Sequence, residues 1–158
     1  MKGFSIRNLS ILLTVSSLSC LPISSYATDS KNLSAPMVSP KVFDAAKKNT
    51  NWKFAYATGE HAQVVFMSVS PQTNPKNEIG METHSFDQII FIVSGKGQAV
   101  LKGKPEVVNI GDMIFIPKGT PHNVINMNPA EPLKILSVYS DTDIPANAVY
   151  KTVADQKE

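Results

Sequence analysis

The chain has 158 residues, of which 42% are hydrophobic and 18% are charged. This length suits one domain of ordinary size, and the ordinary hydrophobic content with few charges argues against a disordered chain. The only arginine, Arg7, lies with Lys2 near the N-terminus, and the remaining sequence balances its scattered lysines against 13 acidic residues. Because a nucleic-acid binder needs a basic surface, we exclude nucleic acid as a partner.

Residues 1–27 have the order of a secretory signal peptide. Lys2 and Arg7 come first, an apolar stretch over 9–18 follows, and the small residues around Ala27 form a cleavage site. The apolar stretch is too short for a spanning helix, which needs about 20 residues, so we expect no stable membrane insertion. We therefore predict a periplasmic or secreted protein, cleaved near Ala27.

Cys20 is the only cysteine, and cleavage near Ala27 would remove it. The mature protein would then have neither a disulfide nor thiol chemistry. The alternative is a lipoprotein attached through Cys20. We favour it less because Ser17 stands where a lipoprotein signal usually has leucine.

The rest of the chain predicts one folded domain with short ends. Residues 28–39 are polar and read as a flexible or extended arm, 40–150 as the domain, and 151–158 as a polar tail. A short helix is expected over 41–48, with Ser39 as its N-cap and Pro40 at its first position.

Short apolar segments separated by turn residues follow the predicted helix. Regular spacing of this kind, punctuated by Gly and Pro, is typical of an all-β sandwich or barrel. The segments predicted as strands are 53–57, 62–70, 79–84, 87–93, 97–101, 106–109, 112–116, 122–127 and 133–140.

Two of the three histidines lie where metal ligands could converge. In strands, alternate side chains share a face, so Glu82, His84 and Gln88 would lie on one face of a continuous sheet. His122 follows a proline-rich turn, from which a strand could bring it opposite them. Two imidazoles and one carboxylate are the ligands of a facial-triad iron site and also suit Zn, Mn or Ni, and Gln88 could add a weak oxygen ligand.

Simpler interpretations of the same residues stay open. A Glu and a His in a hairpin are a solvent-facing pair in most proteins, and a bulge would turn Asp87 inward in place of Gln88. His61 has no partner at a suggestive spacing, so we expect it on the surface.

The segment from Gly111 to Asn126 resembles the second conserved motif of the cupin superfamily. That motif reads G-x5-P-x-G-x2-H-x3-N, and Gly111, Pro117, Gly119, His122 and Asn126 occupy all of its fixed positions. The resemblance covers roughly residues 60–140. The short stretch between the two motifs is similar to that of small single-domain bacterial cupins.

The first cupin motif, G-x5-H-x-H-x3-E-x6-G, is altered. His84 and Gly95 keep their motif positions, whereas Lys76, Glu82 and Gln88 stand at those of a glycine, a histidine and a glutamate. Exchanging His for Glu and Glu for Gln leaves the formal charge of the ligand set unchanged. It also makes the set richer in oxygen, which weakens Ni, Cu and Zn binding relative to a site with more imidazoles.

The resemblance implies a jelly-roll β-barrel that holds a divalent ion, Fe, Mn, Zn or Ni, at the four motif positions Glu82, His84, Gln88 and His122. It implies a small-molecule substrate or ligand, and a homodimer paired through sheet edges. We expect a metal-dependent enzyme, dioxygenase-like or an isomerase. The alternative is a non-catalytic module that binds a sugar or organic acid and has a degenerate metal site.

Overall fold

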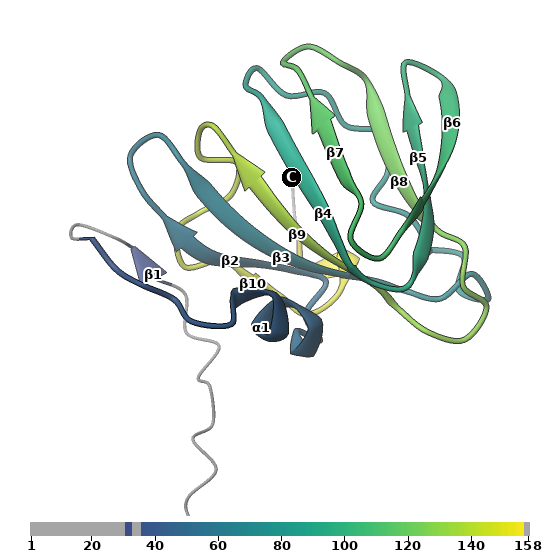
Figure 1. Ribbon diagram of the computed structural model, residues 1–158, viewed down its shortest axis with the longest axis horizontal. Helices are drawn as coiled ribbons and strands as arrows, with labels where there is room; N and C mark the ends of the chain where they lie inside the picture. Colours follow the sequence, from purple (N-terminus) through teal and green to yellow (C-terminus); the bar gives the residue numbers. More distant parts are fainter. Residues whose placement is uncertain (1–30, 33–35, 157–158) are drawn as a thin grey trace, which may run out of the picture.

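The computed structural model describes residues 31–32 and 36–156, whose strands form two β-sheets that face each other (Figure 1). The larger sheet has the order β1-β2-β3-β9-β4-β7, with β10 also pairing with β2, and the smaller has the order β6-β5-β8. The only parallel pairing among them is β1 with β2. The predicted all-β jelly-roll is confirmed.

The predicted strands are present with one exception, and their ends lie within two residues of the expected ones. The elements are β1 (Lys31–Asn32), α1 (Val42–Lys48), β2 (Lys53–Thr58), β3 (Gln63–Val69), β4 (Gln88–Ser94), β5 (Lys96–Leu101), β6 (Lys104–Asn109), β7 (Met113–Ile116), β8 (His122–Asn126), β9 (Leu133–Tyr139), β10 (Val149–Tyr150) and the 3-10 turn η1 (Val153–Asp155).

The exception is the predicted strand 79–84, which was wrong. This segment makes only two isolated bridges, Glu78 with Ile125 and Glu82 with His122. Gly80 interrupts the ladder because its φ is 100°, in the left-handed region, and its N–H donates to the Asn123 side chain at 3.0 Å instead of to a strand.

The predicted capping of the helix was also wrong. The helix begins at Val42, after Lys41 in a left-handed conformation, and has no side-chain cap. The Ser39 hydroxyl instead hydrogen-bonds with the Tyr56 hydroxyl on β2, which takes Ser39 away from the helix end.

The ends of the chain add short elements that the sequence did not predict. Lys31–Asn32, inside the expected arm, pairs with β2, and β10 pairs with the other end of β2. Part of the expected polar tail forms η1. The predicted signal peptide lies outside the described residues. Within the part of the chain that the structure describes, no helix has the length and apolar character needed to cross a membrane.

The main core lies between the two sheets. Along β4, Gln88, Ile90 and Ile92 are buried, whereas Ile89 and Phe91 alternate with them and are only partly buried. The expected alternation is therefore confirmed for this strand. The buried apolar residues of this core are Trp52, Ala55, Val65, Met67, Val69, Ile90, Ile92, Ala99, Val108, Ile114, Ile116, Val124, Leu133, Ile135, Tyr139, Ile144 and Ala148.

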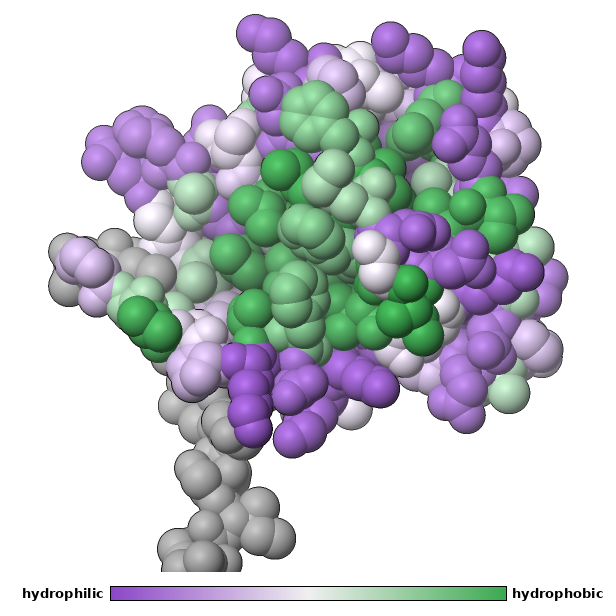
Figure 2. Space-filling model, viewed as in Figure 1, coloured by the Kyte–Doolittle hydropathy of each residue, from purple (hydrophilic) through white to green (hydrophobic). Residues whose placement is uncertain are grey.

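A second apolar cluster covers the outer face of the larger sheet, where α1 packs (Figure 1). Ala46 of the helix is buried against Phe54, Phe66 and Leu136. Figure 2 shows the apolar surface that continues over this face. Phe115 is 53% exposed, because β7 turns its odd-numbered side chains outward.

Candidate metal centre

Glu82 and His122 are fixed directly opposite each other by their backbones. The Glu82 N–H donates to the His122 carbonyl at 2.9 Å, and the His122 N–H donates back to the Glu82 carbonyl at 3.0 Å. Side chains of such an antiparallel pair lie on the same face. The two side chains therefore face the interior together, although the surrounding segment is no regular strand.

His84 joins this pair from two residues further along. Its carbonyl accepts the Gly119 N–H at 2.7 Å, which ties it to the turn before β8. Its ring stacks on Phe86 at a centroid distance of 4.9 Å and lies 5.3 Å from the ring of His122. One ligand atom each from Glu82, His84 and His122 lies within 4.8 Å of the other two.

The contacts that both imidazoles make through Nδ1 leave their Nε2 atoms available for an ion. The His122 Nδ1 lies 2.8 Å from the Thr120 carbonyl oxygen, which can only accept, so Nδ1 carries the proton. The His84 Nδ1 lies 3.4 Å from Asp143 Oδ1. Both Nε2 atoms are buried and make no hydrogen bond within the described structure, although that of His84 lies 3.5 Å from Glu82 Oε2. Anchoring of the second ring nitrogen is the usual arrangement of a metal-binding histidine.

Gln88 supplies an oxygen from the same inner face of β4. Its side chain is buried, and its Nε2 donates to the Ser137 hydroxyl at 2.8 Å. That bond orients the amide and leaves Oε1 buried without a hydrogen-bond partner in the described residues. Asp87 is exposed, so the bulge that would have turned it inward is absent.

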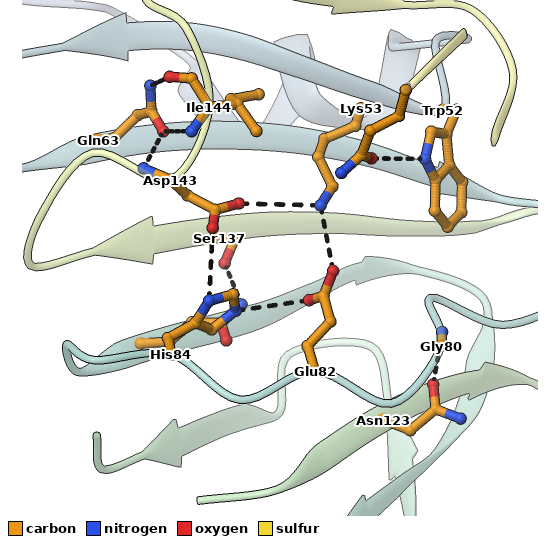
Figure 3. Close-up of polar contacts among 12 residues, drawn as sticks. Trp52, Lys53, Gln63, Gly80, Glu82, His84, Asn123, Ser137, Asp143 and Ile144 are labelled. Carbon is orange, nitrogen blue, oxygen red and sulfur yellow. Dashed lines mark hydrogen bonds and ion pairs between the residues drawn. The ribbon is translucent and has the colours of Figure 1, made fainter. Parts of the chain in front are cut away.

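Two charged residues that sequence reasoning missed lie beside these side chains (Figure 3). The Lys53 ammonium lies 3.2 Å from Glu82 Oε1 and 3.8 Å from Asp143 Oδ2. Asp143 therefore contacts both Lys53 and His84. The one signal that could have revealed Lys53 is a charged residue at the start of a buried strand. No signal pointed to Asp143, because it lies outside both motifs.

Gln63 holds Asp143 in place. Its side-chain oxygen accepts the N–H groups of Asp143 and Ile144 at 3.1 and 3.2 Å, and its amide donates to the Ile144 carbonyl at 2.8 Å (Figure 3). Gln63 is itself fully buried in β3. These bonds fix the loop after β9 in the position that brings the Asp143 carboxylate beside Lys53 and His84.

The charges around the site shift two pKa values. Burial alone would raise the pKa of Glu82, but the His84 ring, whose Nε2 lies 3.5 Å from Glu82 Oε2, and the charge of Lys53 outweigh it, so the pKa is lowered below its usual 4.5. Burial raises the pKa of the Tyr139 hydroxyl well above its usual 10.0, and the Asp143 and Glu82 carboxylates raise it further. Tyr139 therefore stays neutral near neutral pH, whereas Glu82 is ionised.

The lowered pKa of Glu82 predicts how the stability of metal-free protein depends on pH. A carboxylate with a lowered folded-state pKa stabilises the fold above its unfolded-state value of 4.5, and this contribution is lost as the pH falls through the folded-state pKa. We expect the difference in Tm between wild type and Glu82→Gln to be largest near pH 6 and to shrink toward about pH 3. The exposed Glu106→Gln variant is the control. A difference that grows on acidification would contradict the prediction.

Comparison with known proteins identifies the family. Residues 72–139 match the model of the cupin domain family. The uncharacterized protein YrkC of Bacillus subtilis is 33% identical over 139 residues, which are 80% of this chain and 72% of that protein. The chain belongs to the cupin superfamily. A crystal structure of BH2720 from Bacillus halodurans is 32% identical, superposes with a TM-score of 0.71, and covers 77% of this cupin and 93% of its own chain.

A named enzyme is among the more distant relatives of this cupin. Acireductone dioxygenase of Gluconobacter oxydans is 29% identical over 109 residues, which are 65% of this cupin and 57% of that enzyme. KdgF from Halomonas is 21% identical with a TM-score of 0.50 over 58% of this chain and 79% of its own, a likeness that shows the fold alone.

The structure thus brings three predicted site residues, Glu82, His84 and His122, into one cluster that could hold a metal ion. Gln88 lies on the same inner face, as expected. His61 is on the surface, 82% exposed, and belongs to no such cluster among the described residues. The role of the four side chains as ligands stays a prediction.

Proposed function

We propose that this cupin binds one divalent ion, Fe, Mn, Zn or Ni, through Glu82, His84 and His122, with Gln88 as a weak fourth ligand. One observation supports this most directly: both imidazole Nε2 atoms are buried without a hydrogen bond in the described structure, in rings that each offer a ligand atom within 4.8 Å of one another and of a Glu82 carboxylate oxygen. Buried polar atoms normally have partners, and a divalent ion would satisfy both nitrogens at once.

We further propose that the site acts on a small molecule, as a dioxygenase-like enzyme or an isomerase. A bound ion with three or four protein ligands would supply Lewis-acid or redox chemistry at its open positions. The chain itself orients both imidazoles through Thr120 and Asp143 and surrounds them with buried apolar side chains. The likeness to acireductone dioxygenase supports the oxygenase version of this proposal.

A non-catalytic module that binds a sugar or an organic acid is the second candidate. The contact that favours it is the ion pair between Lys53 and Glu82, because an ammonium already compensates the carboxylate that an ion would need. In this version the altered first motif marks a degenerate metal site.

Elemental analysis of protein purified without chelators or a metal-affinity tag tests the proposal. We expect about one equivalent of Fe, Mn, Zn or Ni. An oxygen-uptake screen with Fe(II)-loaded protein and small polar substrates then separates the two candidates. Absence of metal after incubation with each ion would overturn the metal site. A small ligand that raises the Tm without being consumed would support the binding module.

We also propose that the protein acts outside the cytoplasm, in the periplasm or after secretion. Only the order of charged, apolar and small residues over 1–27 supports this location. Mass spectrometry of protein from the periplasmic fraction should give a chain that begins near Thr28, whereas a lipid-modified Cys20 would indicate a lipoprotein.

Self-association as a homodimer is the last part of the proposal. β7 is the end strand of the larger sheet and presents Met113 and Phe115, 58% and 53% exposed, beside Ile110 at 65%. An apolar edge strand is a template for pairing with a second copy. We expect analytical ultracentrifugation to give twice the mass of the chain, and Phe115→Lys to shift the mass toward the monomer. A monomeric wild type would contradict this.

A further inference from the structure

Lys53 is a buried charge that the proposed metal site does not use. Its side chain is 1% exposed, and it extends from the start of β2 between Glu82 and Asp143 (Figure 3). Lysine is almost never fully buried without a partner. The partners of Lys53 are two carboxylates of the candidate site. Glu82 is itself a candidate metal ligand, and Asp143 contacts another one, His84.

The charges around the site leave a positive balance once an ion is bound. The charged side chains in contact there are the carboxylates of Glu82 and Asp143 and the ammonium of Lys53. With neutral imidazoles they sum to one negative charge. A divalent ion would turn this into one uncompensated positive charge in a buried site, where electrostatic interactions are stronger than in water.

The Lys53 ammonium also has donor capacity to spare. It carries three N–H groups, and among the described residues it makes one hydrogen bond, to Glu82 at 3.2 Å. Asp143 at 3.8 Å is an ion pair beyond hydrogen-bond length. An oxygen of a bound ligand can therefore take a charge-assisted hydrogen bond from the same nitrogen.

A hollow at the surface adjoins this arrangement. It has a volume of about 310 Å³, and Glu82 is the residue that it shares with the arrangement, since neither Lys53 nor the two imidazoles line its wall. This volume is at the small end of ligand pockets, which begin at about 300 Å³. A small organic molecule with few apolar atoms fits this size.

We propose that Lys53 binds one oxygen of an anionic ligand, so that the site selects small organic monoanions, carboxylates or enolates, over neutral sugars. This inference rests on the proposed function, because the positive balance requires the divalent ion. It makes Lys53 a specificity-determining residue of the metal-bound site.

Co²⁺ loading followed by anion titration tests the inference without measuring turnover. Acetate serves as the monoanion and acetamide as its neutral isostere, with binding followed through the visible Co²⁺ spectrum. In wild type, acetate should bind about tenfold tighter than acetamide, or more. In Lys53→Met this preference should disappear, while Co²⁺ affinity rises by about fivefold or more, because a repelling charge near Glu82 is gone.

Two further variants complete the experiment. Lys104→Met removes an exposed lysine of β6 and should leave both affinities unchanged. Lys53→Gln removes the same charge but keeps a polar group beside Glu82, and its preference for acetate should be lost as well, which keeps the inference testable even if Lys53→Met does not fold.

The outcomes separate the two levels of proposal. Co²⁺ that does not bind wild type overturns the proposed metal site and this inference with it. Co²⁺ binding with an acetate preference that persists in Lys53→Met, or with none in wild type, overturns only the role of Lys53. An acetate preference that depends on Lys53 supports both.

Discussion

The His122→Ala variant should retain less than about a tenth of the metal that wild type carries, measured by elemental analysis after identical purification. His122 is 2% exposed, and its Nδ1 is anchored to the Thr120 carbonyl, so its Nε2 has one fixed direction. No neighbouring side chain can replace a nitrogen held in this way. The loss should therefore be nearly complete and should not be reversed by excess ion.

The other ligand positions should follow a graded order. His84→Ala should also abolish metal retention, Glu82→Ala should weaken it strongly, and Gln88→Ala should weaken it least, since a neutral amide oxygen is a poorer ligand than a carboxylate or an imidazole. His61→Ala is the matched control, because that histidine is 82% exposed and lies outside the cluster. Equal metal content in wild type and His84→Ala would remove the basis for the assignment.

Asn126→Ala should cause a large loss of stability. Asn126 is fully buried, and its side-chain amide donates to the carbonyls of Val69, Ser70 and Glu131 at 3.1, 2.8 and 2.9 Å. Its side-chain oxygen accepts the N–H of Asn128 at 2.9 Å. One side chain thus satisfies backbone groups at the end of β3 and in the loop between β8 and β9.

Removing that side chain leaves buried carbonyl groups without partners, at a cost of about 3 kcal/mol in the free energy of unfolding. For a domain of this size the Tm should fall by about 10 °C or more. Thermal and urea unfolding of metal-free protein measure this loss. The exposed Asn109→Ala should stay within about 0.5 kcal/mol of wild type. A similar small change for Asn126→Ala would show that water replaces its bonds.

The fold could be predicted well because several residues of the second motif are required by the local backbone conformation or by local hydrogen bonds. Gly111 and Gly119 have φ values of 91° and 73°, in the left-handed region that favours glycine, and they lie in the turns at the two ends of β7. The Asn126 side chain connects the end of β3 with the loop between β8 and β9. These requirements are local, so the sequence shows them directly.

The candidate site could be predicted only in part. Glu82, His84 and His122 were placed together from the motifs, and the structure brings them together. Lys53 and Asp143 were missed because they reach the site from β2 and from the loop after β9, far from the motifs in the chain. Such long-range contacts depend on the packing of the two sheets, and no local spacing encodes it.

The strand predicted over 79–84 failed for a related reason. Gly80 bends the backbone there, and the Asn123 side chain takes the hydrogen bond that a ladder would need. The alternation of faces nevertheless survived, because the bridge between Glu82 and His122 restores the pairing two residues later. The three side chains of Glu82, His84 and His122 therefore lie together as expected, although the predicted strand is absent. Their role as ligands stays a prediction.

The reciprocal backbone pairing of Glu82 with His122 has a consequence for when the protein can acquire its ion. The two side chains come from distant parts of the chain and meet only after β8 has docked against the segment before β4. The newly made, unfolded chain therefore has no high-affinity site. A one-residue slip of this pairing would turn one of the two side chains away from the interior. Capture of the proposed ion would thus be a late event, and the ion pool of the compartment where folding finishes would decide which metal is taken.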